Sequence, residues 1–195
     1  MLTMPNVLTL CRIATVPLIV CLLRFTGPVA SGAAAAVFLV ASITDFLDGY
    51  IARSYGSGTN LGKFLDPLAD KLIVMATLVM LTGMPRSPHV PAWMVVVLVS
   101  RELVITGLRG IAAVEGRIIA ADELGKYKMA LQCIAIQGLL INYTYFHIEF
   151  FAAGMFMLWI AMVVSVWSAV DYIVKARDVF SARPHPAVAK CAAAG

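Results

Sequence analysis

Six apolar stretches, each long enough to cross a membrane as a helix, run through the 195-residue chain. About 20 residues of α-helix span the roughly 30 Å hydrocarbon layer of a bilayer. Turn-forming or polar segments separate the stretches, so the pattern predicts six transmembrane helices. Their predicted ranges are 8–25, 29–53, 61–83, 90–113, 124–143 and 148–174. Residues 1–12 offer an alternative start, as an interfacial helix that turns into the first span.

Composition agrees with a lipid-facing surface. Hydrophobic residues make up 61% of the chain and charged residues 13%, whereas soluble domains are about 45–50% apolar and roughly 25% charged. We therefore expect one all-α membrane domain over residues 1–176, followed by a mobile cytoplasmic tail over residues 177–195. The four cysteines form no C-x-x-C pair, which argues against a disulfide framework or a zinc site.

The placement of Lys and Arg predicts the orientation of the helices. Of the 15 Lys and Arg residues, all but Arg24 and Arg86 fall on one side of the predicted spans. Because positive residues accumulate on the cytoplasmic side, we expect both termini and the second and fourth loops to be cytoplasmic. The membrane would then be the cell (inner) membrane, crossed several times.

Four aspartates stand at the cytoplasmic ends of two consecutive predicted spans: Asp45, Asp48, Asp66 and Asp70. A carboxylate in a membrane segment costs roughly 2.5–3.5 kcal/mol on insertion scales, so four of them need a functional reason. At about 100° per residue, Asp45 and Asp48 share one helix face, and Asp66 and Asp70 share another. The short loop between the two spans makes these helices antiparallel neighbours, so the two faces can meet.

Carboxylates without His or Cys suit Mg²⁺ or Mn²⁺ better than zinc. Four of them are enough to hold two such ions about 4 Å apart, an arrangement that stabilises the attacking and leaving oxygens of a phosphoryl displacement. Gly49 and Ala52 keep the same face free of bulk, and Arg53 offers a fork of donors to a phosphate. Pro67 lies between two of the aspartates, and we expect the third helix to start late or kink there.

The pattern Asp45-x2-Asp48-Gly49-x2-Ala52-Arg53-x8-Gly62-x3-Asp66-x3-Asp70 resembles the signature of the CDP-alcohol phosphotransferase family. The resemblance implies an all-α membrane enzyme, a homodimer, with two divalent cations. Asp45 and Asp66 would bridge both ions, Asp48 would bind one, and Asp70 would bind the other and act as general base. The CDP-linked lipid would contact a further set of residues: Gly49, Ala52, Arg53, Thr59 and Gly62.

Secondary motifs resemble the phosphatidylglycerophosphate synthase branch of that family, whose acceptor is glycerol 3-phosphate. They are Pro5–Arg12, Gly62–Lys71, Ser100–Leu103, Gly107–Arg109, Gly125–Lys128 and Trp167–Tyr172. Met129 departs from the Thr that often follows the fifth motif. This resemblance implies transfer of the phosphatidyl group from CDP-diacylglycerol to glycerol 3-phosphate, with release of CMP.

The acceptor's own phosphate needs cations beyond the two metals, and Arg suits bidentate phosphate binding. The candidates are Arg101, Arg109, Lys126 and Lys128. Each also has a structural reading: Arg101 can pair with Glu102 or Asp70, and the other three can anchor the protein at the membrane surface.

Other functions remain open from the sequence. The same family uses other acceptors, namely inositol phosphate, serine or phosphatidylglycerol. Intramembrane carboxylates also mark cation transporters, but transporter sites lie near the bilayer midplane, often between inverted repeats. The four aspartates lie at one edge of the spans and no repeat is visible, so the sequence favours the enzyme.

Overall fold

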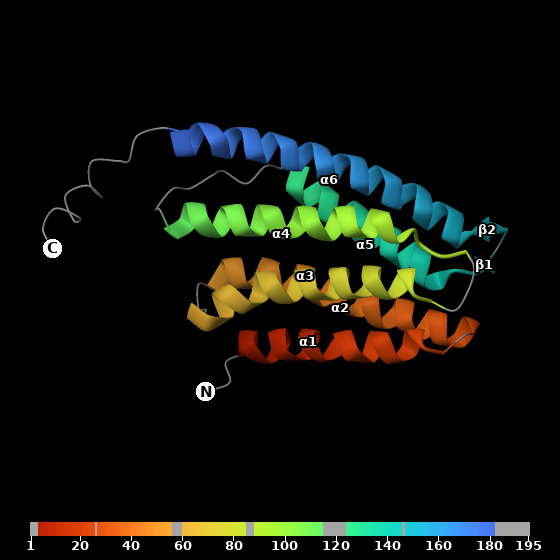
Figure 1. Ribbon diagram of the computed structural model, residues 1–195. Helices are drawn as coiled ribbons and strands as arrows, with labels where there is room; N and C mark the ends of the chain where they lie inside the picture. Colours follow the sequence, from red (N-terminus) through yellow and green to blue (C-terminus); the bar gives the residue numbers. More distant parts are fainter. Residues whose placement is uncertain are drawn as a thin grey trace, which may run out of the picture.

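The computed structural model describes residues 4–25, 27–55, 60–84, 88–114, 124–145 and 147–181. Side chains are described for residues 13–25, 27–44, 71–84, 88–112, 127–144 and 147–177. Across these residues the chain forms six α-helices and one short hairpin (Figure 1). The elements are α1 (Met4–Leu23), α2 (Pro28–Tyr55), α3 (Asn60–Thr82), α4 (Ala92–Val114), α5 (Leu124–Ile141), β1 (Thr144–Tyr145), β2 (Ile148–Glu149) and α6 (Phe150–Ser181).

The all-α fold is confirmed, and each predicted span corresponds to one helix. Two expectations about helix starts are corrected. Met4–Leu23 is one continuous helix, with Pro17 inside it, and not a separate interfacial helix followed by a span. Helix α3 begins at Asn60 and its helical backbone continues through Pro67, so the late start is wrong, while the alternative of a kink at Pro67 stays a prediction. Helix α6 continues past Arg177 to Ser181, and the tail predicted beyond it lies outside the described residues.

Successive helices run in opposite directions along the bundle (Figure 1). Helices α2 and α4 therefore finish, and α3 and α5 begin, toward the end where α1 begins and α6 finishes, on the left in this view. The α1–α2 connection, the α3–α4 connection and the hairpin lie at the opposite end. The membrane orientation expected from Lys and Arg stays a prediction.

The hairpin between α5 and α6 was not predicted. Thr144 pairs with Glu149 and Tyr145 with Ile148, in antiparallel register. Asn142 and His147 have φ angles of 56° and 63°, a left-handed conformation in which Asn and His are enriched among non-glycine residues. These two residues turn the chain tightly enough to bring α6 back against α5.

Helices α5 and α6 form the most extensive contact of the bundle, and α1 packs against both α2 and α3. The α5–α6 contact depends on two glycines that face each other. A Cβ atom built on Gly154 would lie 2.7 Å from the Leu139 nitrogen and 3.0 Å from the Ala135 oxygen. Small residues at such a crossing let helix backbones approach closely.

The main core gathers buried side chains from all six helices, and α5 and α6 supply several of them. Phe38, Leu78, Leu98, Leu139 and Leu158 are each almost completely inaccessible. A smaller apolar cluster joins α4 to α6 near the end that holds the α4–α5 connection, and it contains Ile105, Ala169, Tyr172 and Ala176. This second cluster positions the polar residues described below.

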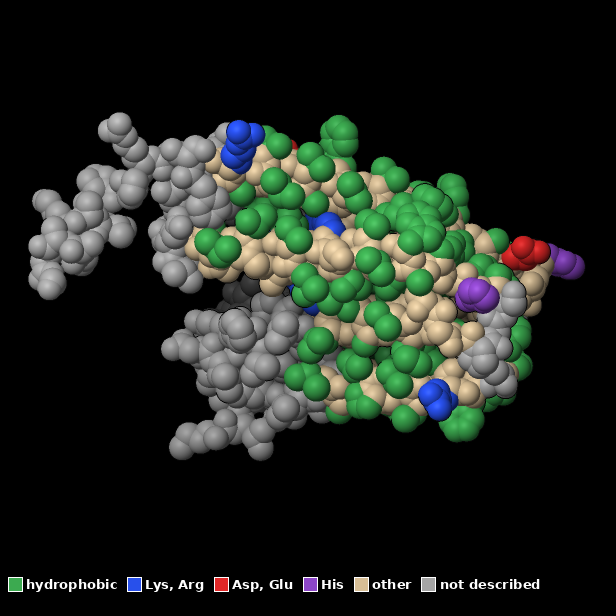
Figure 2. All heavy atoms as spheres, viewed as in Figure 1, with side chains coloured by type: hydrophobic (Ala, Val, Ile, Leu, Met, Phe, Trp, Pro, Cys, Tyr) green, Lys and Arg blue, Asp and Glu red, His purple; other side chains and the backbone are tan. Residues whose placement is uncertain are grey.

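Large apolar side chains also cover the outside of the bundle, as Figure 2 shows for one face. Leu103, Val163 and Trp167 are more than half exposed, Trp167 to 71%. Soluble monomers rarely expose broad apolar patches, which usually mark a partner or a membrane. Among the described residues, one stretch, Phe150–Arg177 of α6, is long and apolar enough by itself to cross a bilayer.

Candidate functional site

Helical backbone carries all four aspartates of the signature. Asp45 and Asp48 lie one turn apart in the second half of α2, and Asp66 and Asp70 one turn apart in the first half of α3. Because α2 ends and α3 begins at the same end of the bundle (Figure 1), the two pairs belong to the same end of neighbouring segments. Their side chains lie outside the described part, so their convergence stays a prediction.

The predicted contacts to the CDP-linked lipid also stay predictions. Gly49, Ala52 and Arg53 fall within α2 and Gly62 falls within α3, where only the backbone is described. Thr59 lies outside the described residues altogether. The donor set remains chemically coherent: four hard carboxylates on two helices match the ligands that Mg²⁺ and Mn²⁺ prefer.

A buried ion cluster lies beside this segment, because Lys71 directly follows Asp70 in α3. Its centre is Glu102 of α4, whose side chain is 12% exposed and which receives cations from three helices. Oε1 of Glu102 binds the Arg101 Nη1 at 2.7 Å and also the Lys128 Nζ from α5, while Oε2 lies 3.7 Å from the Lys71 Nζ. We call Lys71, Arg101, Glu102, Thr106 and Lys128 the Glu102 cluster.

Arg101 connects the cluster to α6. Its Nε donates to the Ser165 carbonyl oxygen at 2.8 Å, and its Nη2 donates to the Ser168 Oγ at 3.0 Å. Together with the bond to Glu102, these contacts engage all three guanidinium nitrogens. The alternative in which Arg101 pairs with Glu102 is therefore realised, and Arg101 joins α4 to α6.

Thr106 holds the cluster from one turn further along α4. Its Oγ1 donates to the Glu102 carbonyl oxygen at 2.6 Å and accepts a hydrogen bond from the Lys71 Nζ. Lys71 is thus held by both a carboxylate and a hydroxyl. Sequence reasoning missed Lys71, Thr106, Ser165 and Ser168 as partners, because these residues come from segments far apart in the chain.

The other predicted acceptor residues are placed differently. Arg109 lies two turns from Arg101 on α4, exposed, with its Cζ 5.2 Å from the centre of the Tyr172 ring of α6. Lys128 is buried in the cluster. Lys126 belongs to the first turn of α5, but its side chain is not among those described. The structure therefore brings Arg101 and Lys128 together and leaves Arg109 on the same helix face.

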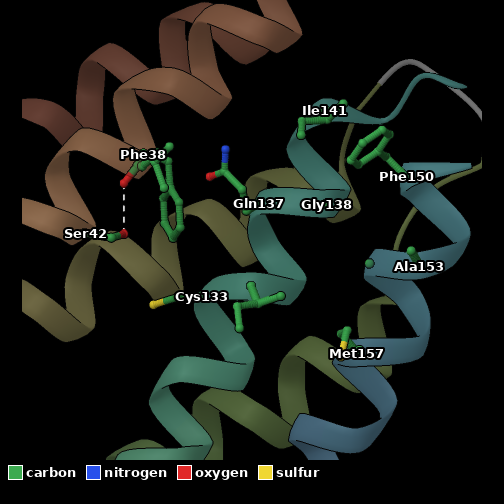
Figure 3. Close-up of a pocket in the computed structure, with 12 residues that line it drawn as sticks. Phe38, Ser42, Cys133, Gln137, Gly138, Ile141, Phe150, Ala153 and Met157 are labelled. Atoms are coloured by element: carbon green, nitrogen blue, oxygen red, sulfur yellow. Dashed lines mark hydrogen bonds between the residues drawn. The ribbon is translucent and has the colours of Figure 1, made fainter. Parts of the chain in front are cut away.

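An apolar cavity of about 390 Å³ lies between α2, α5 and α6 (Figure 3). Phe38 and Ser42 line it from α2, Cys133 and Gln137 from α5, and Met157 from α6. Ser42 donates to the Phe38 carbonyl at 2.8 Å, and the Gln137 Nε2 donates to the Ala35 carbonyl at 3.1 Å. The buried Gln137 Oε1 has no hydrogen-bond partner among the described residues. Ser42 lies one turn before Asp45 on α2, so the cavity begins close to the first aspartate.

A family model for CDP-alcohol phosphatidyltransferases matches residues 2–167. A Bacillus subtilis CDP-diacylglycerol–glycerol-3-phosphate 3-phosphatidyltransferase is 42% identical over 90% of this chain and 95% of its own length. A Rickettsia bellii protein with the same name is 34% identical over 91% of this chain and 97% of its own. A rice cardiolipin synthase (CMP-forming) is 36% identical over 90% of this chain and 57% of its own length. The chain belongs to the CDP-alcohol phosphatidyltransferase family.

Proposed function

We propose that this chain transfers the phosphatidyl group of CDP-diacylglycerol to glycerol 3-phosphate, giving phosphatidylglycerophosphate and CMP. The observation that carries this choice of acceptor is the Glu102 cluster. Three cations gather around a single buried carboxylate directly beside the segment that carries the aspartate signature. An acceptor with its own phosphate is an anion that these cations suit. The relatives from Bacillus and Rickettsia carry the name of this activity.

Members of the family generally depend on divalent metal ions. In our proposal Asp45, Asp48, Asp66 and Asp70 hold two such ions, Mg²⁺ or Mn²⁺. Bound there, the ions would offset the negative charge that develops on the pyrophosphate of the donor.

The chain's own residues would perform the transfer as follows. The Asp70 carboxylate takes the proton of the glycerol C1 hydroxyl. The resulting oxygen attacks the phosphorus that carries diacylglycerol, and the bond from that phosphorus to the CMP oxygen breaks. Gly49, Ala52, Arg53, Thr59 and Gly62 would bind the CDP end of the donor.

The apolar cavity between α2, α5 and α6 suits a fatty acyl chain of this donor. Its lining is almost entirely hydrocarbon, and it starts one helical turn from Asp45. A lipid substrate needs its phosphates at the aspartates and its tails in an apolar environment, and α2 offers both along one helix.

We propose further that all six helices span the cell membrane, that both termini and the active site face the cytoplasm, and that the enzyme is a homodimer. The exposed apolar side chains along the bundle support the first point. The asymmetric distribution of Lys and Arg supports the second. The third rests on family resemblance.

An acceptor panel tests the proposed reaction. Purified protein in detergent receives labelled CDP-diacylglycerol, Mg²⁺ and one acceptor at a time: glycerol 3-phosphate, phosphatidylglycerol, inositol phosphate or serine. We expect phosphatidylglycerophosphate with the first acceptor and little product with the others. Efficient formation of cardiolipin from phosphatidylglycerol would instead support a second candidate function, cardiolipin synthesis. The name of the rice relative favours this alternative.

A further inference from the structure

Glu102 lies outside the aspartate signature, yet it makes three ionic contacts, with cations from α3, α4 and α5. We propose that Glu102 is a positioning residue for the acceptor: it holds the Lys71 and Lys128 ammonium groups where they meet the acceptor's phosphate. This inference rests on the proposed function and names how that function selects its second substrate.

The cations of the Glu102 cluster have two different roles. Arg101 uses Nε, Nη1 and Nη2 on Ser165, Glu102 and Ser168, so it fixes the Glu102 carboxylate against α6. Lys128 approaches the carboxylate from α5 and Lys71 approaches it from α3. An ammonium group has three N–H donors, so Lys128 can donate to a phosphate oxygen as well as to Glu102, while Lys71 is also held by Thr106.

Burial makes this placement necessary. The side chains of Arg101 and Lys128 are 10% and 8% exposed. Long Lys side chains have large rotamer freedom, and buried ammonium groups are stable only with an anionic partner. Without Glu102, Lys71 and Lys128 would repel each other and Arg101, and they would move apart toward water.

Glu102 is the shared partner of the cations in the cluster. Among the described side chains, three cations face this one carboxylate. The carboxylate keeps the cations from repelling one another when no acceptor is bound, and they can then meet the acceptor's phosphate as a group. Glu102 thus differs from the four aspartates, since it would contact neither metal nor substrate.

Three variants test this role in purified full-length protein. Glu102→Gln keeps the shape and removes the charge, Glu102→Asp keeps the charge and shortens the side chain, and Glu149→Gln removes an exposed carboxylate of β2 as the matched control. For each, KM for glycerol 3-phosphate, KM for CDP-diacylglycerol and kcat are measured with phosphatidylglycerophosphate as the product.

We expect Glu102→Gln to raise the KM for glycerol 3-phosphate at least about 10-fold, the effect of one lost charge-assisted hydrogen bond. The KM for CDP-diacylglycerol should stay within about 2-fold, and the Glu149→Gln control should match the wild type in both. Glu102→Asp should lie between wild type and Glu102→Gln. If Glu102→Gln does not fold, Glu102→Asp decides, with an expected rise of about 3-fold or more in the KM for glycerol 3-phosphate alone.

An unchanged or lowered KM for glycerol 3-phosphate in the folded variants would overturn the inference, because Glu102 would then be irrelevant to the acceptor or would compete with it. Equal increases in both KM values would also overturn it. Failure of the proposed function looks different: the wild type itself would form no phosphatidylglycerophosphate from glycerol 3-phosphate.

Discussion

Arg101 and Arg109 lie two turns apart on the same face of α4, but their surroundings differ. Arg101 is surrounded by partners from α4 and α6, whereas Arg109 is exposed and rests on the Tyr172 ring. Breaking a buried ion pair leaves an uncompensated charge behind, which costs much more than removing an exposed cation. The same substitution should therefore have different consequences at the two positions.

We predict that Arg101→Ala lowers the free energy of unfolding by about 3–5 kcal/mol, as is typical when one partner of a buried ion pair is removed. Arg109→Ala should change it by no more than about 1 kcal/mol, the worth of an exposed cation–π contact. Unfolding in detergent, followed by circular dichroism, measures both. Equal stability of the two variants would show that the Arg101 contacts contribute nothing to the fold.

Asp70 belongs to a different group of residues, since its predicted role is chemical. Asp70→Asn keeps the size of the side chain and removes its basicity and charge. We expect turnover to fall at least about 100-fold, typical of a lost general base, while binding of CDP-diacylglycerol weakens less. Single-turnover kinetics with a parallel binding measurement separate the two effects, and near-normal turnover would remove Asp70 from this role.

At the scale of helices, the hydrophobic pattern is a reliable guide to this chain. Long apolar runs between turn-forming segments favour helices, so the number and order of the helices follow from the sequence. The hairpin was missed because its strands are only two residues each and depend on left-handed backbone at Asn142 and His147. The late start expected for α3 was wrong because Pro67 removes the single backbone hydrogen bond to residue 63, a loss that does not end the helix.

The candidate site was less predictable than the helices. Residues within one motif, such as Asp45 and Asp48, can be placed on one face from spacing alone. The Glu102 cluster joins residues from α3, α4 and α5, with α6 as its support, and such contacts depend on helix packing that no local pattern encodes. Arg101 illustrates the difference: the sequence allowed both a phosphate ligand and an ion pair, and packing against Ser165 and Ser168 favours the ion pair.

The α5–α6 crossing should be sensitive to a single methyl group. Gly154→Ala would place a Cβ 2.7 Å from the Leu139 nitrogen, so we expect a loss of about 1–3 kcal/mol, the usual cost of overpacking. Gly32→Ala in α2 is the control, because its Cβ would meet nothing within 4 Å, and Ala favours helix over Gly. Thermal unfolding of both variants in detergent checks this, and a Gly154→Ala variant as stable as Gly32→Ala would contradict the close crossing.

At the scale of the whole molecule, the aspartates of the proposed reaction belong to one end of the bundle. The connection between α2 and α3 lies there, as do the start of α1 and the end of α6 (Figure 1). The other end carries the hairpin and short connections. A lipid donor can therefore place its charged head at one end and its tails along the apolar bundle, while a water-soluble acceptor enters from the same end.

Removal of divalent metal tests the proposal that the four aspartates hold metal ions needed for the transfer. We predict that excess EDTA abolishes turnover and that added Mg²⁺ or Mn²⁺ restores it, because hard carboxylates bind these ions best. The protein should stay folded under chelation, which circular dichroism can verify. Full turnover in excess EDTA would exclude a metal-dependent transfer.

The central claim is that this enzyme transfers a phosphatidyl group to an acceptor that it recognises by the acceptor's phosphate. The most direct measurement is the ratio of kcat/KM for glycerol 3-phosphate to kcat/KM for glycerol, with the same CDP-diacylglycerol and metal. We predict a ratio of at least about 100 in the wild type, since two or more charge-assisted hydrogen bonds are lost with glycerol, and a ratio at least about 10-fold smaller in Lys128→Met. Equal efficiency with the two acceptors, or an undiminished ratio in Lys128→Met, would contradict the account.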